Sequence, residues 1–131
     1  MGGLQLIQYV DHVAITVKDM TRSTKFYTEK LGFTITRSSE TPSMKTVFVG
    51  RGQVQLELFA LKQGSAKPVP ELQQDEIGIK HIAFNVTDLD TLIKEFTEKG
   101  IVFISEIRQA GTRRHIFFKD PDGITLQLLE G

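Results

Sequence analysis

The chain has 131 residues, of which 40% are hydrophobic and 24% are charged, a composition typical of one globular domain. Its 16 Lys and Arg balance its 16 Asp and Glu, which argues against a broad cationic surface that would hold nucleic acid or an anionic membrane. The absence of cysteine excludes disulfides and thiol chemistry, and the lack of a secretion signal or of an apolar stretch of roughly 20 residues predicts a cytoplasmic protein without a membrane partner.

The first half of the chain predicts a strand, a helix and three further strands. Apolar and polar residues alternate over 9–17, as in a half-buried strand. Asp19 is suited to cap a helix over 20–31, which Gly32 would end. The following strands are expected over residues 33–36, 46–50 and 53–60.

The second half repeats this order. A strand over 78–86 precedes a helix that Asp88 would cap and Gly100 would end. Strands are then expected over residues 102–107, 115–119 and 124–129. The segment 120–123, Asp-Pro-Asp-Gly, predicts a tight turn rather than a calcium site, because the spacing lacks further oxygen ligands.

The two halves are related by an internal repeat. The segment DHVAITVKD at 11–19 returns as KHIAFNVTD at 80–88, so that His81 follows His12 by 69 positions (81 minus 12). Such a repeat predicts an α+β fold of two βαβββ modules, about 9–60 and 78–130, joined by a loop over 61–77 within one domain, 1–131. Because one module is too small to bury its sheet alone, we expect the two to pack together.

Four polar residues occupy paired positions in the two modules. His12 and His81 begin the first strand of each module, and Glu57 and Gln127 lie midway along the last strand. Because side chains alternate along a strand, all four oppose the apolar face that the helices would cover, and they line the inside of a curved sheet. Two imidazole nitrogens and two oxygen ligands suit one divalent metal ion, such as zinc, nickel, cobalt, manganese or iron.

A simpler interpretation of the same residues is a solvated strand face, on which two histidines coincide by chance. The paired positions in the two modules favour the metal interpretation. His115 belongs to no pair and is expected to be a surface residue.

Four segments carry a family resemblance: DHVAITVKDMTRSTKFYTEKLGF, VQLELF, IKHIAFNVTDLD and FFKDPDGITLQLLE. With them, the chain resembles the vicinal oxygen chelate superfamily, which includes glyoxalase I, methylmalonyl-CoA epimerase, extradiol dioxygenases and the fosfomycin- and bleomycin-resistance proteins. The resemblance covers residues 9–130. It implies paired modules that form an open, cupped mixed β-barrel with the helices outside, around a metal held by His12, Glu57, His81 and Gln127. It also implies a homodimer.

The chain departs from this family at the residues that would define its best-known activity. Gln127 stands where glyoxalase I usually has the glutamate that abstracts a proton, and an amide cannot act as a base near neutral pH. Thr16 and Leu61 stand where relatives that use glutathione have arginine and asparagine. We therefore expect a metal-dependent lyase or isomerase that acts on a small oxygenated carbonyl substrate without glutathione.

Glu57 is the only carboxylate among the four expected ligands. With a 2+ ion, its single charge leaves a formal +1 centre that favours an anionic or oxyanion-bearing ligand. By the approximate two-fold symmetry of the repeat, Glu57 is also our candidate for the catalytic base. Further pocket candidates, chosen by their position in the alternation, are Thr16, Thr46, Phe48, Phe59, Asn85, Arg114 and Phe117.

Two other functions stay open at this point. His12, His81 and Glu57 match the two-histidine, one-carboxylate iron site of ring-cleaving dioxygenases, although Gln127 would then occupy a position needed by substrate or oxygen. A protein that binds and sequesters an antibiotic, like the bleomycin-resistance relatives, is the non-enzymatic alternative.

Overall fold

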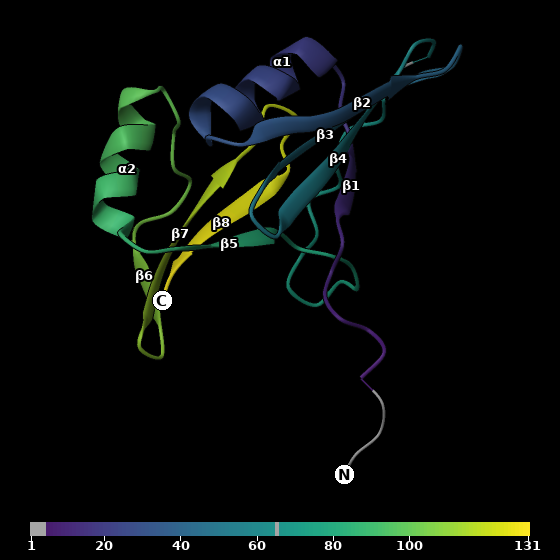
Figure 1. Ribbon diagram of the computed structural model, residues 1–131. Helices are drawn as coiled ribbons and strands as arrows, with labels where there is room; N and C mark the ends of the chain where they lie inside the picture. The colour runs from purple at the N-terminus through teal and green to yellow at the C-terminus, as the bar shows by residue number, and fades with distance from the viewer. Residues whose placement is uncertain (1–4, 65) are drawn as a thin grey trace.

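A computed structural model describes residues 5–64 and 66–131 and contains two repeated modules (Figure 1). The first module consists of β1 (Val13–Thr16), α1 (Met20–Lys25), the π-helical turn η1 (Phe26–Lys30), β2 (Thr34–Glu40), β3 (Met44–Arg51) and β4 (Val54–Leu61). The second consists of β5 (Ile82–Val86), α2 (Leu89–Glu98), β6 (Arg108–Ala110), β7 (Arg113–Lys119) and β8 (Thr125–Glu130). Both modules therefore follow the order βαβββ that the repeat predicts.

Each module forms a four-stranded mixed sheet, and the two sheets have the same topology. The strand orders are β1-β4-β3-β2 in the first sheet and β5-β8-β7-β6 in the second. In each sheet the first strand runs parallel to the last strand of its module, and the other pairs are antiparallel. The predicted α+β class with paired modules is confirmed, and the two sheets do not close into a full barrel.

The helices begin where the sequence predicts because aspartate side chains cap them. The Oδ1 atoms of Asp19 and Asp88 accept the backbone N–H groups of Arg22 and Thr91, each at 3.1 Å. Gly32 and Gly100 follow the two helices with φ angles of 84° and 88°, a conformation that glycine adopts without a steric cost. The π-helical turn was not predicted; in it, the N–H of Leu31 donates to the carbonyl of Phe26 at 3.2 Å.

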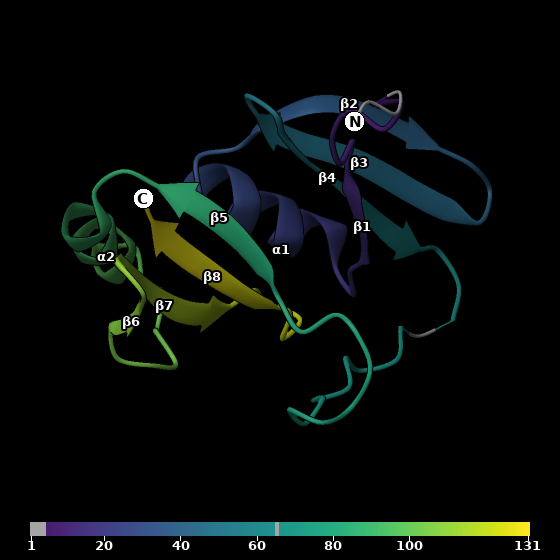
Figure 2. The ribbon, with the colours of Figure 1, turned by 90° about the horizontal axis from the view of Figure 1, so that it is seen from below.

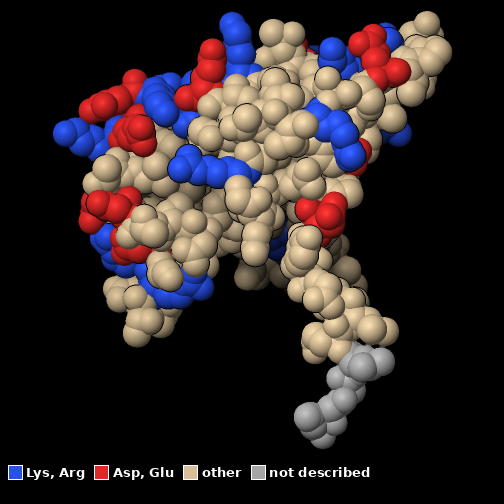
Figure 3. All heavy atoms as spheres, viewed as in Figure 1, with Lys and Arg blue, Asp and Glu red and all other residues tan. Residues whose placement is uncertain are grey.

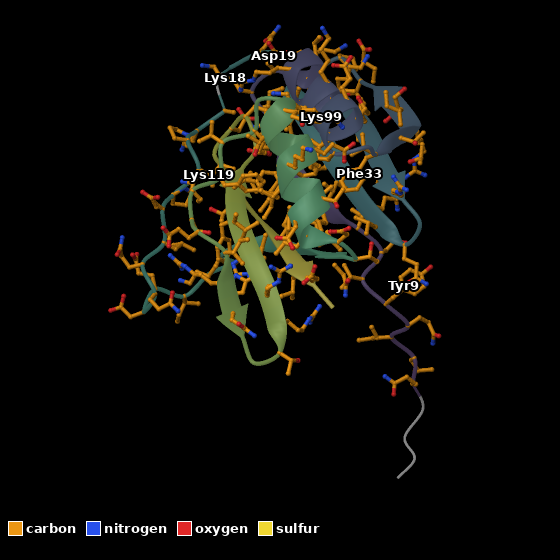
Figure 4. The ribbon with its side chains drawn as sticks, turned by 90° about the vertical axis from the view of Figure 1, so that its left-hand side faces the viewer. Tyr9, Lys18, Asp19, Phe33, Lys99 and Lys119 are labelled. Carbon is orange, nitrogen blue, oxygen red and sulfur yellow. The ribbon has the colours of Figure 1, made fainter. Side chains whose placement is uncertain are left out.

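The first helix lies between the two sheets (Figure 2), and one hydrophobic core joins the modules. Phe26 packs against Phe118 of the second sheet, with ring centroids 6.4 Å apart. Phe33, labelled in Figure 4, meets Phe84 of β5 edge to face at 5.5 Å. The fully buried core residues are Val17, Tyr27, Val49, Leu56, Leu58, Leu89, Phe118 and Leu126.

The turn at 120–123 ties the first helix to the second sheet. The backbone N–H of Gly123 donates to the carbonyl of Asp120 at 3.1 Å, which confirms the predicted turn. The buried carboxylate of Asp120 accepts the Tyr27 hydroxyl at 2.7 Å, and Arg22 binds Asp122 at 2.7 Å. Burial raises the pKa of both the Asp120 carboxyl and the Tyr27 hydroxyl.

Two sequence predictions on strands need correction. The expected strand over 102–107 is wrong: this segment makes one isolated bridge, between Phe103 and Phe118, and the short strand β6 begins only at Arg108. The first strand of each module is also shorter than predicted, since β1 begins at Val13 and β5 at Ile82. Each histidine therefore lies just before its strand rather than within it.

The surface matches the balanced composition. On the face shown in Figure 3, basic and acidic side chains are interspersed over the helices and the neighbouring strands. Within residues 5–64 and 66–131, no helix has the length and apolar character needed to cross a membrane.

Candidate metal and substrate site

On the face of the first sheet that carries Glu57, the strand register places four residues side by side. Ala14 of β1 pairs with Glu57 of β4, which pairs with Phe48 of β3, which pairs with Arg37 of β2. Directly paired residues point to the same side of a sheet. The opposite side carries the core residues Ile15, Val47, Val49, Leu56 and Leu58.

The second sheet repeats this row with one change of residue type. Ala83 of β5 pairs with Gln127 of β8, which pairs with Phe117 of β7. Glutamate in the first sheet is therefore matched by glutamine in the second, between an alanine and a phenylalanine in both cases. We call the two polar sides the site faces of the sheets.

Each histidine packs on the phenylalanine of its own row. The His12 and Phe48 rings lie 5.5 Å apart at an interplanar angle of 73°. The His81 and Phe117 rings lie 5.2 Å apart at 76°. This agreement shows that the two-fold repeat extends from the backbone to the side chains of the site faces. The alternation had marked both phenylalanines as pocket candidates.

In the first module, His12 is held between two carboxylates. Its Nε2 lies 3.4 Å from Oε1 of Glu57, and its Nδ1 lies 2.8 Å from Oδ2 of Asp11. A carboxylate on the outer nitrogen of a histidine fixes the ring and its tautomer, and this arrangement recurs around protein-bound metals. Sequence reasoning passed over Asp11, although its position next to His12 was a signal.

In the second module, the corresponding pair contains no carboxylate. Gln127 is 8% exposed and buried in the sheet, whereas His81 is exposed. The position that corresponds to Asp11 is Lys80, whose ammonium group donates to the backbone carbonyls of Gln73 and Glu76. His81 therefore has no orienting carboxylate beside it in the sequence.

The structure of one chain brings the predicted ligands together as two pairs and not as one group of four. His12 and Glu57 are in contact on the first site face, and His81 and Gln127 lie on the second. In the part of the chain that the structure describes, no three His, Cys, Asp or Glu residues are placed so that they could hold a metal ion. The donor types fit a divalent ion, and each sheet contributes half of the set.

Two further sequence assignments are corrected by the structure. Arg114 was expected to face the pocket, but it points to the helix side, where it binds Asp90 at 2.9 Å and Glu130 at 3.1 Å. These contacts raise its pKa and lower that of Glu130. His115 was expected at the surface, but it is half-buried on the second site face, with its ring 5.5 Å from Phe117.

Large apolar side chains are exposed immediately before each histidine. Leu6, Ile7, Tyr9 and Val10 precede His12 and are 77%, 84%, 66% and 73% exposed. Figure 4 shows Tyr9 on the segment that leads away from the body of the molecule. Ile77 and Ile79 precede His81 and are also exposed. Exposed apolar side chains of this kind are typical of interaction surfaces.

Comparison with known proteins places this geometry in a family. Residues 9–128 match the family model described as Glyoxalase/Bleomycin resistance protein/Dioxygenase superfamily. An uncharacterized protein of Bacillus subtilis, YwkD, is 34% identical over 130 residues, which span 95% of this chain and 98% of that protein. The crystal structure of a glyoxalase family protein from Enterococcus faecalis superposes with a TM-score of 0.81 at 30% identity, covering 96% and 100% of the two chains.

The relatives whose names state an activity do not share one. A probable lactoylglutathione lyase of Synechocystis is 28% identical over 91% of this chain and 92% of that protein. The methylmalonyl-CoA epimerase of mouse is 26% identical over 91% of this chain and 71% of that protein. TnmS3, an antibiotic binding protein from Streptomyces, shares the fold with a TM-score of 0.74 at 19% identity, covering 97% and 98% of the two chains.

Proposed function

The chain belongs to the Glyoxalase/Bleomycin resistance protein/Dioxygenase superfamily, and on that premise we propose that it is a metal-dependent lyase or isomerase. Its substrate is a small oxygenated carbonyl compound, and glutathione is not required. The observation that carries this proposal is the His12–Glu57 pair, matched by His81 and Gln127 at equivalent places of the second sheet.

The metal site of this proposal is formed by two copies of the chain. His12 and Glu57 of one copy and His81 and Gln127 of the other would hold the ion, so that a homodimer has two such sites. The separation of the two pairs in one chain supports this assignment. The exposed apolar residues before each histidine support it as well, because a second copy would cover them beside each half-site.

Glu57 is the group that moves a proton in this proposal. A divalent ion bound at the site would supply Lewis-acid polarisation of the substrate oxygens, which makes a neighbouring carbon-bound proton more acidic. Glu57 is half-buried and has His12 on one side and the open site face on the other, where a substrate would lie. Gln127 cannot take the proton because a neutral amide has no basic oxygen near pH 7.

Thr16 and Leu61, at the positions where relatives that use glutathione have arginine and asparagine, support a smaller substrate. Thr16 lies at the end of β1, and Leu61 at the end of β4 is 49% exposed. Neither side chain can form the charged or amide contacts that arginine and asparagine make in glutathione-using relatives. The substrate is therefore fixed by the site faces themselves.

Proton exchange tests this function directly. The protein is loaded in turn with zinc, nickel, cobalt and manganese, and proton NMR in D2O follows the uncharged hydroxyacetone and lactaldehyde and the anionic dihydroxyacetone phosphate. We expect the loss of a carbon-bound proton signal with at least one metal. The Glu57→Gln variant should keep the metal, measured by elemental analysis, and lose the exchange by about 100-fold or more.

Two controls define the outcomes. Glu71→Gln changes an exposed carboxylate in the linker and should leave the exchange unchanged. Unchanged exchange in Glu57→Gln would rule out Glu57 as the base. A protein that binds none of the metals would overturn the enzymatic proposal and favour a binding protein instead.

A further inference from the structure

Among the described residues, three arginines on the site faces belong to neither half of the proposed metal site: Arg37, Arg108 and Arg113. Arg113 donates to the backbone carbonyl of Glu130 at 3.3 Å, so the two considered further are Arg37 and Arg108. Arg37 of β2 pairs with Phe48, and Arg108 of β6 pairs with His115. Both are on the outer strands, two strand positions away from the strand that carries Glu57 or Gln127. At roughly 4.8 Å per strand, each arginine backbone lies about 10 Å from that strand.

Arg37 is held in place over the first site face. Its guanidinium carbon lies 4.2 Å from the centre of the Phe48 ring, whose edge also meets His12. Stacking on an aromatic ring orients a guanidinium group without neutralising it. The side chain is therefore fixed close to His12 and keeps its hydrogen-bond donors available.

Arg108 lies directly opposite His115 on the second site face. His115 pairs with Leu129, which pairs with Asn85, so that these side chains form the row next to Gln127 and Phe117. The rings of His81, Phe117 and His115 follow one another at 5.2 and 5.5 Å. The His115 Nδ1 is buried and has no hydrogen-bond partner within the described residues. The corresponding row of the first sheet carries Thr46 in place of His115.

Arg37 and Arg108 have no counter-ion on the described parts of the site faces, whereas two other arginines are paired with carboxylates. Arg22 binds Asp122, and Arg114 binds Asp90 and Glu130. Arg51 also has no carboxylate partner among the described residues, but it lies on the helix side of the first sheet. Across residues 5–64 and 66–131, no carboxylate lies within 4.0 Å of the guanidinium of Arg37 or Arg108. Two unpaired guanidinium groups on the faces that form the site favour an anionic ligand.

From this arrangement we infer that the substrate carries a carboxylate or phosphate group in addition to the two oxygens that a metal would bind. Arg37 of one copy and Arg108 of the other bind this group. Guanidinium groups match carboxylate and phosphate oxygens through paired N–H donors. The inference deepens the proposed function and rests on it for the position of the chelating oxygens, and it restricts the substrates to small anionic hydroxy- or oxo-carbonyl compounds.

The test compares two metal chelators that differ by one charge. Acetohydroxamate and succinic acid monohydroxamate present the same chelating group, and only the second has a carboxylate. Calorimetric titration of the metal-loaded protein should show the anionic probe binding at least about tenfold more tightly. Arg37→Gln and Arg108→Gln should each reduce this preference by about tenfold.

Arg51→Gln is the matched control. Arg51 is also an exposed arginine of the first sheet, but it lies on the helix side, near Gly32. This variant should keep the full preference for the anionic probe. Equal affinities of the two probes for the metal-loaded protein would overturn the inference and leave the proposed metal chemistry intact.

A second measurement covers the case in which no metal binds. Inorganic phosphate is titrated into the metal-free protein while NMR follows the side-chain Nε–H signals of the arginines. Shifts of the Arg37 and Arg108 signals, with the Arg51 signal unmoved, would support the anion site although the metal-dependent function had failed. Unmoved signals of Arg37 and Arg108 would refute it.

Discussion

The two modules have the same strand order and the same histidine position, but they differ in the charges around that histidine. In the first module, Asp11 and Glu57 lie on either side of His12. In the second, the equivalent positions carry Lys80 and Gln127, and the neighbouring row carries His115 and Arg108. A duplicated scaffold thus presents an acidic half and a neutral to basic half.

This difference suggests a division of roles between the halves of the proposed site. The acidic half supplies the charge that attracts a divalent ion and the carboxylate that moves a proton. The neutral to basic half supplies the ligands His81 and Gln127 and also Arg108, which together with Arg37 of the acidic half suits an anionic substrate. Substitutions that remove a charged group from one half or add it to the other test this division of roles directly.

Removal of Glu57 should have the largest effect. Glu57→Ala deletes the only charged ligand of the proposed set, so we expect metal affinity to fall by more than about 100-fold, beyond the cost of losing an outer-shell partner. Gln127→Ala removes a neutral ligand at the equivalent place and should cost less. Competition with a fluorescent chelator measures both affinities. Equal losses would show that the halves do not differ in the way proposed.

The carboxylate behind His12 should have the next largest effect. Asp11→Ala removes the group that orients the His12 ring through Nδ1, and we expect a loss of metal affinity of roughly 10- to 100-fold. Lys80→Met changes the equivalent residue before His81 and should leave the affinity unchanged. A similar loss of metal affinity in both variants would indicate an effect on folding and not on the orientation of the His12 ring.

Adding a carboxylate to the second half should reduce the difference in charge between the two halves of the proposed site. Gln127→Glu places a charge opposite Glu57, and we expect metal affinity to rise by about tenfold, which corresponds to about 1.4 kcal/mol. In the background of Glu57→Gln, the same change should restore proton exchange, since it moves the carboxylate to the other half. Failure of this double variant to exchange protons, with metal bound, would indicate that the halves are not interchangeable.

Removing a hydrogen bond between the modules should have a weaker effect. It should change the stability of the whole protein and not the properties of one half of the site. Tyr27→Phe removes the hydroxyl that donates to buried Asp120, and we expect the free energy of unfolding to fall by about 1 to 2 kcal/mol. Urea denaturation measures this change. Tyr9→Phe, at an exposed position, is the control and should leave the stability unchanged.

The same pair predicts how stability depends on pH. The folded state raises the pKa of Tyr27 above the ordinary value of 10.0, so the unfolded chain loses this proton first as the pH rises. The stability of the wild-type protein should therefore fall above pH 10. In Tyr27→Phe this contribution is absent, and the fall should be smaller. An equally steep fall in both proteins would assign the effect to other groups.

The sequence was sufficient for the fold because the repeat and the strand alternation depend on local patterns. His12 and His81, 69 positions apart, identified the modules, and alternation placed Glu57 and Gln127 opposite the core. The expected strand over 102–107 failed because Val102 and Ile104 alternate with Phe103 as in a strand, although both are exposed and only Phe103 packs on the sheet. Alternation cannot tell an edge segment from a paired strand.

The site was less predictable because it depends on contacts between distant residues. His115 has no counterpart of its own type in the first module and was therefore assigned to the surface, although alternation puts it on the same side of β7 as Phe117, two positions later. Arg114 was misplaced because it is three positions from Phe117, and alternation along the regular strand β7 puts residues three positions apart on opposite sides. In the proposed dimer the two pairs of ligands meet across two chains, and no local pattern of the sequence encodes such a contact.

The placement of the two half-sites on separate faces of one chain has a consequence for mixtures of variants. His12→Ala and His81→Ala should each be inactive alone, since every site of such a homodimer lacks one imidazole. In a mixed dimer of the two variants, both lesions fall into the same site, and the other site recovers all four ligands. Two inactive proteins would thus complement each other when their subunits exchange, with one working centre per hybrid molecule.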